Sequence, residues 1–215
     1  MIVCSNQFFM KERRIIDEKD PENQHKKELI TMELYQGIEQ RRTIRKFQGP
    51  ATETQLKRIL AAGTQAPSGM NKQNWEFVLV DDPGIIEQIG QIKYVHNRGK
   101  AAGEEVPEEV EKGALKQRDS FKKASLVMVY CNRELADSVG PWLCLGNMSL
   151  AAVAEGLGSR IARFSGDAVG QINAILHAPQ QMELVAAFSV GIAAEEPAPR
   201  KLRPEGSWLH RNRFA

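Results

Sequence analysis

The sequence has few cysteines, no long apolar run and almost no net charge. Its three cysteines, Cys4, Cys131 and Cys144, are an odd number without a CxxC pair, which argues against a disulfide framework or a structural zinc site. No apolar stretch approaches the roughly 18 residues of a membrane span, and the N-terminus lacks the apolar region of a secretory signal. The net charge of +2 creates no overall field that favours nucleic acid or an anionic membrane. We therefore expect a cytoplasmic protein with neither nucleic acid nor membrane as a partner.

Several common signatures of catalysis and nucleotide binding are also missing. The four histidines show no metal-ligand spacing, and no nucleophile-elbow motif occurs. Neither GxGxxG nor GxxxxGK[ST] is found. The sequence therefore gives no sign of a metal centre, a Rossmann site or a P-loop.

A cluster of cationic side chains stands out against this background. Residues 41–47 read RRTIRKF and place four cationic side chains within six positions. Arginine offers a planar fork of donors that matches a phosphate, and the hydroxyl of Thr43 adds a short neutral donor. The stretch suits a partly buried anion site, with a solvated basic helix end as the alternative.

A second stretch follows about one helix later. Residues 66–75 read APSGMNKQNW, a turn-rich loop of small and amide side chains that ends at a predicted strand. Such a loop presents backbone N–H groups, a hydroxyl and carboxamides to a polar heterocycle, and loops of this kind often carry function.

The apolar pattern predicts alternating helices and strands in one domain of ordinary size. Hairpin signals are absent, so an α+β fold with a sheet flanked by helices is expected. A capping box formed by Thr52 and Gln55 opens the second helix. The predicted helices are 28–40, 52–62, 82–93, 137–157 and 167–177, and the predicted strands are 75–80 (largely buried), 125–131, 159–164 and 183–192.

Four segments have unusual composition. Residues 1–28 form a charged N-terminal arm, either a solvated helix or a tail that packs on a partner subunit. Residues 94–123 are polar and are expected to run over the surface, partly as helix. The helix at 137–157 is apolar around most of its circumference, which predicts burial in the core or at a subunit interface. Residues 195–215 form a basic, proline-punctuated C-terminal tail.

The two motifs, in this order and followed by a strand, resemble the flavin-dependent nitroreductase family. Weaker matches extend the resemblance over residues 29–214. It implies a central, mostly antiparallel sheet and an obligate homodimer that binds FMN at the subunit interface. The helix at 137–157 is then the candidate dimer core. Residues 94–123 are a candidate lid over the cofactor, or else an ordinary charged surface segment.

The resemblance also implies which residues hold FMN. Two departures from the family pattern occur: Gly69 replaces a common serine, and Ser165 replaces the acidic residue of several nitroreductases. Ser165 and Gly166 precede a predicted helix N-terminus, whose free N–H groups would hold the flavin edge, although a plain N-cap role is an alternative. The expected FMN ligands are Arg41, Thr43 and Arg45 at the phosphate, Arg42 beside it or the ring, Pro67, Ser68, Gly69, Asn71 and Gln73 along the ribityl chain and ring, Ser165 and Gly166 at the ring edge, and Arg200, Lys201 or Arg203 closing the phosphate site.

The expected function is electron transfer from NADH or NADPH through FMN to a nitroaromatic, a quinone or a similar small-molecule acceptor. The flavin carries the chemistry, so no side chain is assigned as a catalyst, and the nicotinamide is a transient substrate. One alternative is a dehalogenating or flavin-consuming enzyme of the same fold. Others are a non-catalytic FMN-binding protein and a basic module for nucleic acid, against which the near-neutral charge counts.

Overall fold

A computed structural model of the chain describes residues 34–99, 104–204 and 206–214. The predicted arm at 1–28 and the first part of the helix predicted at 28–40 lie outside the described residues. The elements are α2 (Leu34–Gln40), β1 (Phe47–Pro50), α3 (Glu53–Gly63), η1 (Gly69–Asn71), β2 (Glu76–Val80), α4 (Pro83–Arg98), α5 (Glu108–Asp119), β3 (Ser125–Asn132), η2 (Arg133–Leu135), α6 (Gly140–Ala154), β4 (Gly158–Ala162), α7 (Asp167–Ile175) and β5 (Met182–Ala193).

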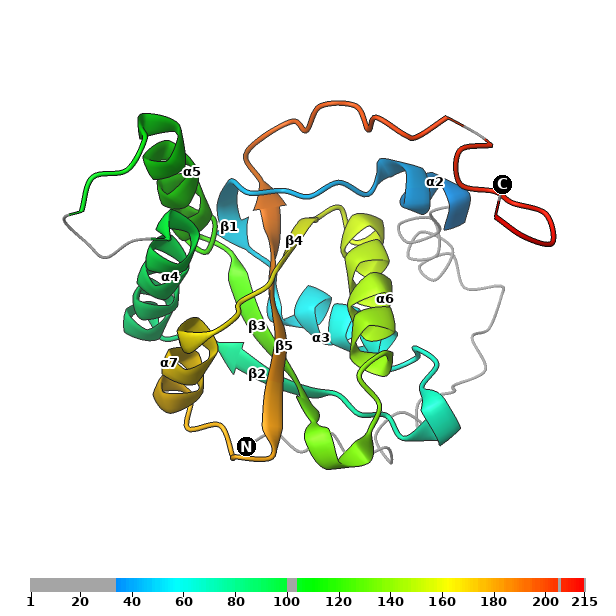
Figure 1. Ribbon diagram of the computed structural model, residues 1–215, viewed down its shortest axis with the longest axis horizontal. Helices are drawn as coiled ribbons and strands as arrows, with labels where there is room; N and C mark the ends of the chain where they lie inside the picture. Colours follow the sequence, from blue (N-terminus) through cyan, green and yellow to red (C-terminus); the bar gives the residue numbers. More distant parts are fainter. Residues whose placement is uncertain (1–33, 100–103, 205, 215) are drawn as a thin grey trace, which may run out of the picture.

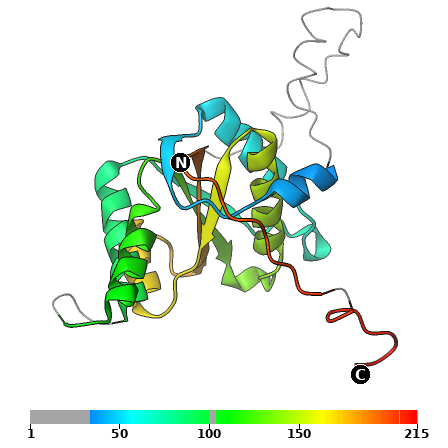
Figure 2. The same cartoon turned by 90° about the horizontal axis from the view of Figure 1, so that it is seen from above.

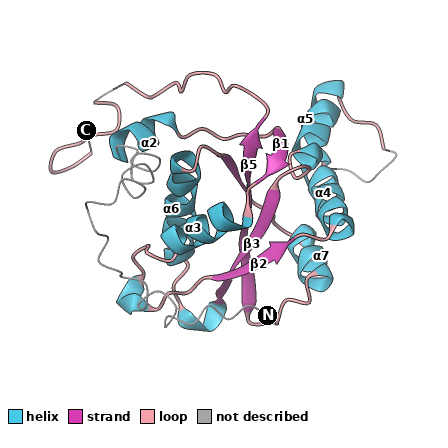
Figure 3. Cartoon of the chain, turned by 180° about the vertical axis from the view of Figure 1, so that it is seen from behind, coloured by secondary structure: helices cyan, strands magenta, loops and turns pink. Residues whose placement is uncertain are grey.

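The sheet is built around β5. This strand pairs with β1, β3 and β4, and β3 pairs in turn with β2. Every pairing between these named strands is antiparallel. Helices α4, α5 and α7 lie on one side of the sheet and α3 and α6 on the other (Figures 1 and 3). The predicted α+β fold with a central, mostly antiparallel sheet is therefore confirmed.

Strand β3 shows how the core divides into two layers. Val127 and Val129 belong to the cluster that packs beneath α3 and α6. Leu126, Met128 and Tyr130 belong to the cluster that packs against α4 and α7. Because side chains alternate across a strand, a strand covered by helices on both faces is apolar at every position.

One prediction of burial is wrong, and one of the two alternatives in a second prediction is not met. Strand β2 is not largely buried, since Val78 and Leu79 are 37% and 46% exposed and of its side chains only Val80 is buried. Helix α6 buries one face and leaves Trp142 and Leu143 39% and 43% exposed. Apolarity all around α6 therefore does not place it at the centre of this chain's core, and the subunit-interface interpretation stays a prediction.

The segment predicted to run over the surface is more ordered than its polarity indicated. Helix α4 continues beyond the predicted end at Lys93 to Arg98, and α5 packs against it. Tyr94 donates from its hydroxyl to Glu111, and Arg98 Nε donates to Glu111 Oε2 at 2.6 Å. The prediction of partial helix is confirmed, and a lid role stays a prediction.

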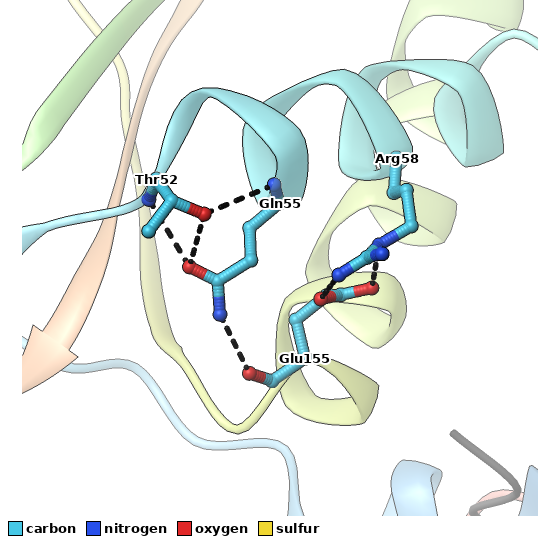
Figure 4. Close-up of polar contacts among 4 residues, drawn as sticks. All are labelled: Thr52, Gln55, Arg58 and Glu155. Atoms are coloured by element: carbon cyan, nitrogen blue, oxygen red, sulfur yellow. Dashed lines mark hydrogen bonds and ion pairs between the residues drawn. The ribbon is translucent and has the colours of Figure 1, made fainter. Parts of the chain in front are cut away.

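Helices α3 and α6 are joined at one end by a polar clamp (Figure 4). The Thr52 hydroxyl accepts from Gln55 N at 3.3 Å, and Gln55 Oε1 accepts from Thr52 N at 3.1 Å, which confirms the capping box. Gln55 Nε2 also donates to the carbonyl of Glu155 at 3.2 Å. Arg58 binds the Glu155 carboxylate in a bidentate pair with both distances 2.7 Å. The start of α3 is thus tied to the end of α6.

We predict that Thr52→Ala lowers the free energy of unfolding by about 1 kcal/mol, because it removes the cap of α3. Thr54→Ala is the control, since Thr54 is exposed in the same first turn and makes no cap bond. Urea denaturation of the two variants measures the difference. An equal loss in both would contradict a specific role for the cap.

Candidate functional site

A cationic cluster lies between α2 and β1. Arg200 Nη2, from the C-terminal tail, donates to the carbonyl of Arg41 at 2.8 Å. Burial lowers the pKa of Arg41 below its usual value, and the positive charges of Arg200 and Arg42 lower it further. In the part of the chain that the structure describes, no carboxylate forms an ion pair with these three arginines. Such a group of uncompensated guanidinium groups suits an anion such as phosphate.

The backbone after this cluster is anchored to β4. Thr43 forms a parallel bridge with Ser159, and Ile44, which is buried, donates from its N–H to the Ser159 carbonyl at 3.0 Å. Glu195 Oε1 accepts from Lys46 N at 3.2 Å and also from Arg45 N. The stretch that carries the arginines is thus held rigidly beside the start of β4.

The three cationic candidates in the C-terminal tail differ in what they contact. After β5 the chain runs back alongside the α2–β1 connection (Figures 1 and 2), where Arg200 reaches Arg41. Arg203 Nη2 instead donates to the carbonyl of Ser207, and Lys201 is exposed. Arg45 turns toward a groove of about 440 Å³ that it shares with Lys116 and other residues. The structure therefore joins Arg200, and neither Lys201 nor Arg203, to the Arg41 cluster.

The loop at 66–75 is strained and tightly held. Met70, Asn71 and Gln73 have φ angles of 52°, 55° and 49°, a left-handed region that residues other than glycine seldom adopt. Ser68 Oγ accepts from Gln73 N at 2.9 Å. Asn74 is buried and donates to the carbonyls of Asn132 at 3.0 Å and Asp137 at 2.8 Å. Strain of this kind persists only where the surroundings impose it, and it concentrates at functional sites.

Beside this loop lies a buried acceptor without a partner. Asp137 Oδ1 accepts from Gly140 N, at the start of α6, at 3.0 Å. Asp137 Oδ2 is buried and accepts no hydrogen bond from the described residues. A side chain at Gly140 would meet both this oxygen and the Cβ of Ser68. Sequence reasoning missed Asn74 and Asp137 as parts of the site, because nothing local signals that a loop residue is buried.

The turn after β4 offers free backbone donors. Gly166 is the N-cap of α7, with φ 59° and no side-chain cap bond. The alternative that Ser165 or Asp167 caps this helix is therefore not met. Ser165 and Gly166 are exposed. Six residues separate Ser165 from Ser159, so the turn lies roughly 20 Å from the cationic cluster along β4.

Two of the groups of predicted site residues lie at opposite ends of β5 within one chain. The cationic cluster lies near Ala193, which ends β5, because Lys46 accepts from Ala194 N. The loop lies near Met182, which begins β5, because Asn74 binds Asn132 and Asn132 pairs with Met182. The twelve residues of β5 separate these ends by roughly 35–40 Å. The cationic cluster and the loop are therefore well separated within one chain.

Two further cations lie on the inner side of β4. Arg160 donates to Ser120 Oγ and Gln117 Oε1. The central carbon of its guanidinium lies over the Phe121 ring, 5.0 Å from the ring centroid. Lys93 Nζ donates to the carbonyl of Arg163 at 2.5 Å. Burial, and secondarily the charge of Arg160, lowers the pKa of Lys93 to about 8. Burial lowers the pKa of Arg160 to about 10, with a smaller effect from Arg45.

Other types of site find no support among the described residues. No group of three or more His, Cys, Asp and Glu side chains is arranged to hold a metal ion in residues 34–99, 104–204 and 206–214. Burial raises the pKa of the Cys144 thiol to about 12, and Cys131 is buried too, so both are packing residues. In the same ranges, no helix combines the length and apolarity needed to cross a bilayer.

The described residues thus form an α+β protein with a cluster of arginines near the start of β4 and an exposed turn after its end. The chain belongs to the Nitroreductase family, whose profile matches residues 38–192. This match confirms the resemblance found in the sequence.

Among relatives of known function, the chain is 28% identical over 182 residues to an iodotyrosine deiodinase of Thermotoga neapolitana, covering 80% of this chain and 94% of that protein. It is 27% identical over 187 residues to an NADH dehydrogenase of Thermus thermophilus, covering 76% of this chain and 88% of that protein.

Two solved structures share the fold. An iodotyrosine deiodinase bound to FMN and 3-iodo-L-tyrosine has a TM-score of 0.66 at 24% identity, covering 85% of this chain and all of that one. An FMN-dependent nitroreductase of Clostridium difficile has a TM-score of 0.65 at 23% identity, covering 83% and 98%.

We predict that the free energy of unfolding rises by about 1–2 kcal/mol between pH 7.5 and 9.5 through Lys93 alone. The pKa of Lys93 is about 8 in the folded protein against 10.5 as its ordinary value. In this window the unfolded chain binds more protons, so raising the pH relieves the cost of burying the charge. The rise should be absent from Lys93→Met and present in Lys112→Met, an exposed lysine of α5. Chemical denaturation at several pH values tests this, and parallel pH profiles in wild type and Lys93→Met would contradict it.

Proposed function

We propose that the protein is an FMN-dependent oxidoreductase that takes electrons from NADH or NADPH and delivers them to a nitroaromatic, a quinone or a similar acceptor. The observation that carries the proposal is the cluster of Arg41, Arg42 and Arg200, three cationic side chains without an ion-pair partner in the described part of the chain. The family and its FMN-containing structures support the choice of cofactor.

The arrangement along β4 fits a mononucleotide. Arg41, Arg42 and Arg200 would hold the phosphate, with Thr43 and Arg45 as further donors from the same stretch. The backbone N–H groups at Ser165 and Gly166 would hold the ring edge, since a helix N-terminus favours negative charge. When bound there, FMN supplies the redox chemistry, and the chain contributes binding, orientation and electrostatics. Arg203 and Lys201 are left as weaker phosphate candidates.

The loop at 66–75 would serve the FMN site of a partner subunit in a homodimer. Within one chain it lies at the opposite end of β5 from the cationic cluster, yet its strain and the free Asp137 oxygen point to a ligand. The apolar surface that a dimer would cover is present on α6, where Trp142 and Leu143 are exposed, and on α2, where Tyr35 is 78% exposed. In such a dimer, Pro67, Ser68, Gly69, Asn71 and Gln73 would contact the FMN held by the other chain. A monomer in sedimentation experiments with FMN present would contradict this arrangement.

We predict that Arg41→Gln and Arg200→Gln each raise the dissociation constant for FMN about 10- to 100-fold. A charge-assisted hydrogen bond contributes about 1.5–3 kcal/mol, and each 1.4 kcal/mol is a factor of ten. Arg203→Gln should have a smaller effect, because its guanidinium binds Ser207. Lys57→Gln is the control for loss of charge, because Lys57 is an exposed residue of α3. Fluorescence titration with FMN measures the constants, and unchanged affinity in both variants would remove the phosphate assignment.

The proposal as a whole is tested by a visible absorption spectrum. The purified protein is mixed with FMN, desalted and then exposed to NADH or NADPH without oxygen. A retained flavin band that either nucleotide bleaches is expected, and the faster nucleotide identifies the donor. A retained band that neither nucleotide bleaches contradicts NAD(P)H dependence, and a lost band contradicts FMN binding.

A second candidate function is reductive dehalogenation of a halogenated aromatic amino acid. The observation that favours it is the match to the Thermotoga neapolitana iodotyrosine deiodinase, which extends over 94% of that protein. Incubation of the FMN-loaded, dithionite-reduced protein with 3-iodotyrosine and assay of released iodide tests this function. Absence of iodide release above the rate with free FMN would exclude it.

A further inference from the structure

Lys93 and Arg160 are charges that the protein buries without an opposing charge. Lys93 is 6% exposed and Arg160 is 4% exposed. Neither forms an ion pair with a carboxylate among the described residues. Besides burial, the charge of Arg45 lowers the pKa of Arg160, and the charge of Arg160 lowers the pKa of Lys93. The result is a line of positive charge from the basic stretch to α4.

This line is costly for the fold alone. Taking a charge out of water costs several kcal/mol even when hydrogen bonds are kept, and apolar side chains of similar size pack at lower cost. Neutral partners at Gln117, Ser120 and the Arg163 carbonyl orient the two side chains but do not neutralise them. Two buried cations without an opposing charge in a helix–sheet interface therefore indicate that an anion binds nearby.

Arg160 belongs to β4, and Lys93 contacts the backbone just after this strand. Arg160 points inward, whereas its neighbour Ile161 is 36% exposed, and Arg163 is exposed over the ring of Trp142. Lys93 donates to the carbonyl of Arg163, two residues before Ser165. This contact fixes the backbone just ahead of the turn. The charges thus lie behind the same strand and turn along which FMN is proposed to bind.

We propose that Lys93 and Arg160 are positioning residues whose charge, acting through β4, favours the more negative reduced state of FMN and so raises its reduction potential. The inference rests on the proposed function. A charge in a poorly solvated interior acts over a longer distance than one in water. The pair touches neither FMN nor substrate. Its effect is electrostatic, and it differs from that of the phosphate ligands, which bind both redox states.

The experiment measures the reduction potential of FMN bound to the full-length protein at pH 7, with reference dyes, in matched variants. In Lys93→Met the preference for reduced over oxidised FMN should fall about tenfold, which for a two-electron couple is a potential lower by about 30 mV. Lys93→Arg keeps the charge and should restore the wild-type potential. Lys112→Met removes an exposed charge of the same sign and should leave the potential unchanged. If Lys93→Met does not fold, Arg160→Gln replaces it with the same expectation.

The outcomes separate the inference from the function on which it rests. Equal potentials in wild type and Lys93→Met, with FMN bound to both, overturn the inference and leave the proposed function standing. Equal losses in Lys93→Met and Lys93→Arg also overturn it, because geometry and not charge would then be responsible. Failure of the wild type to bind FMN overturns the proposed function and the inference together.

Discussion

The antiparallel pairing of β5 with three other strands fixes the position of every part of the site. Through β1 and β4 it places the cationic stretch at one end of the sheet, and through β3 it places the strained loop at the other. Hydrogen-bond register leaves little freedom here, since a slip of one residue would turn each strand's side chains to the wrong face. The separation of the two motifs within one chain is therefore a property of the sheet itself.

Positive charge in this protein is arranged asymmetrically although the total is nearly balanced. Some acidic side chains are paired with lysines on helix surfaces, as Glu108 is with Lys112 and Glu53 with Lys57. The uncompensated cations gather around β4 instead. Surface pairs of this type contribute little to stability. The net charge of +2 conceals this arrangement.

The sequence was informative where structure is decided locally. The capping box of Thr52 and Gln55, the alternation of helices and strands and the fold class all follow from short-range patterns, and the structure confirms them. The motifs at 41–47 and 66–75 indicated the family, but their roles toward FMN stay predictions. Patterns in sequence did not reveal that Lys93 and Arg160 are buried, because burial of a charge depends on which helix covers which strand. The exposure of β2 was missed for the same reason.

The central position of β5 also determines the order in which the sheet can assemble. A chain is synthesised from its N-terminus, and all strands that pair with β5 precede it in sequence. Until residues 182–193 leave the ribosome, the only pairing between named strands that can form is that of β2 with β3. During most of synthesis the sheet between the two layers of the core is incomplete. The apolar faces of both layers stay accessible for that time. The sheet is thus completed only when β5 is available, with long-range contacts closing last and slowly.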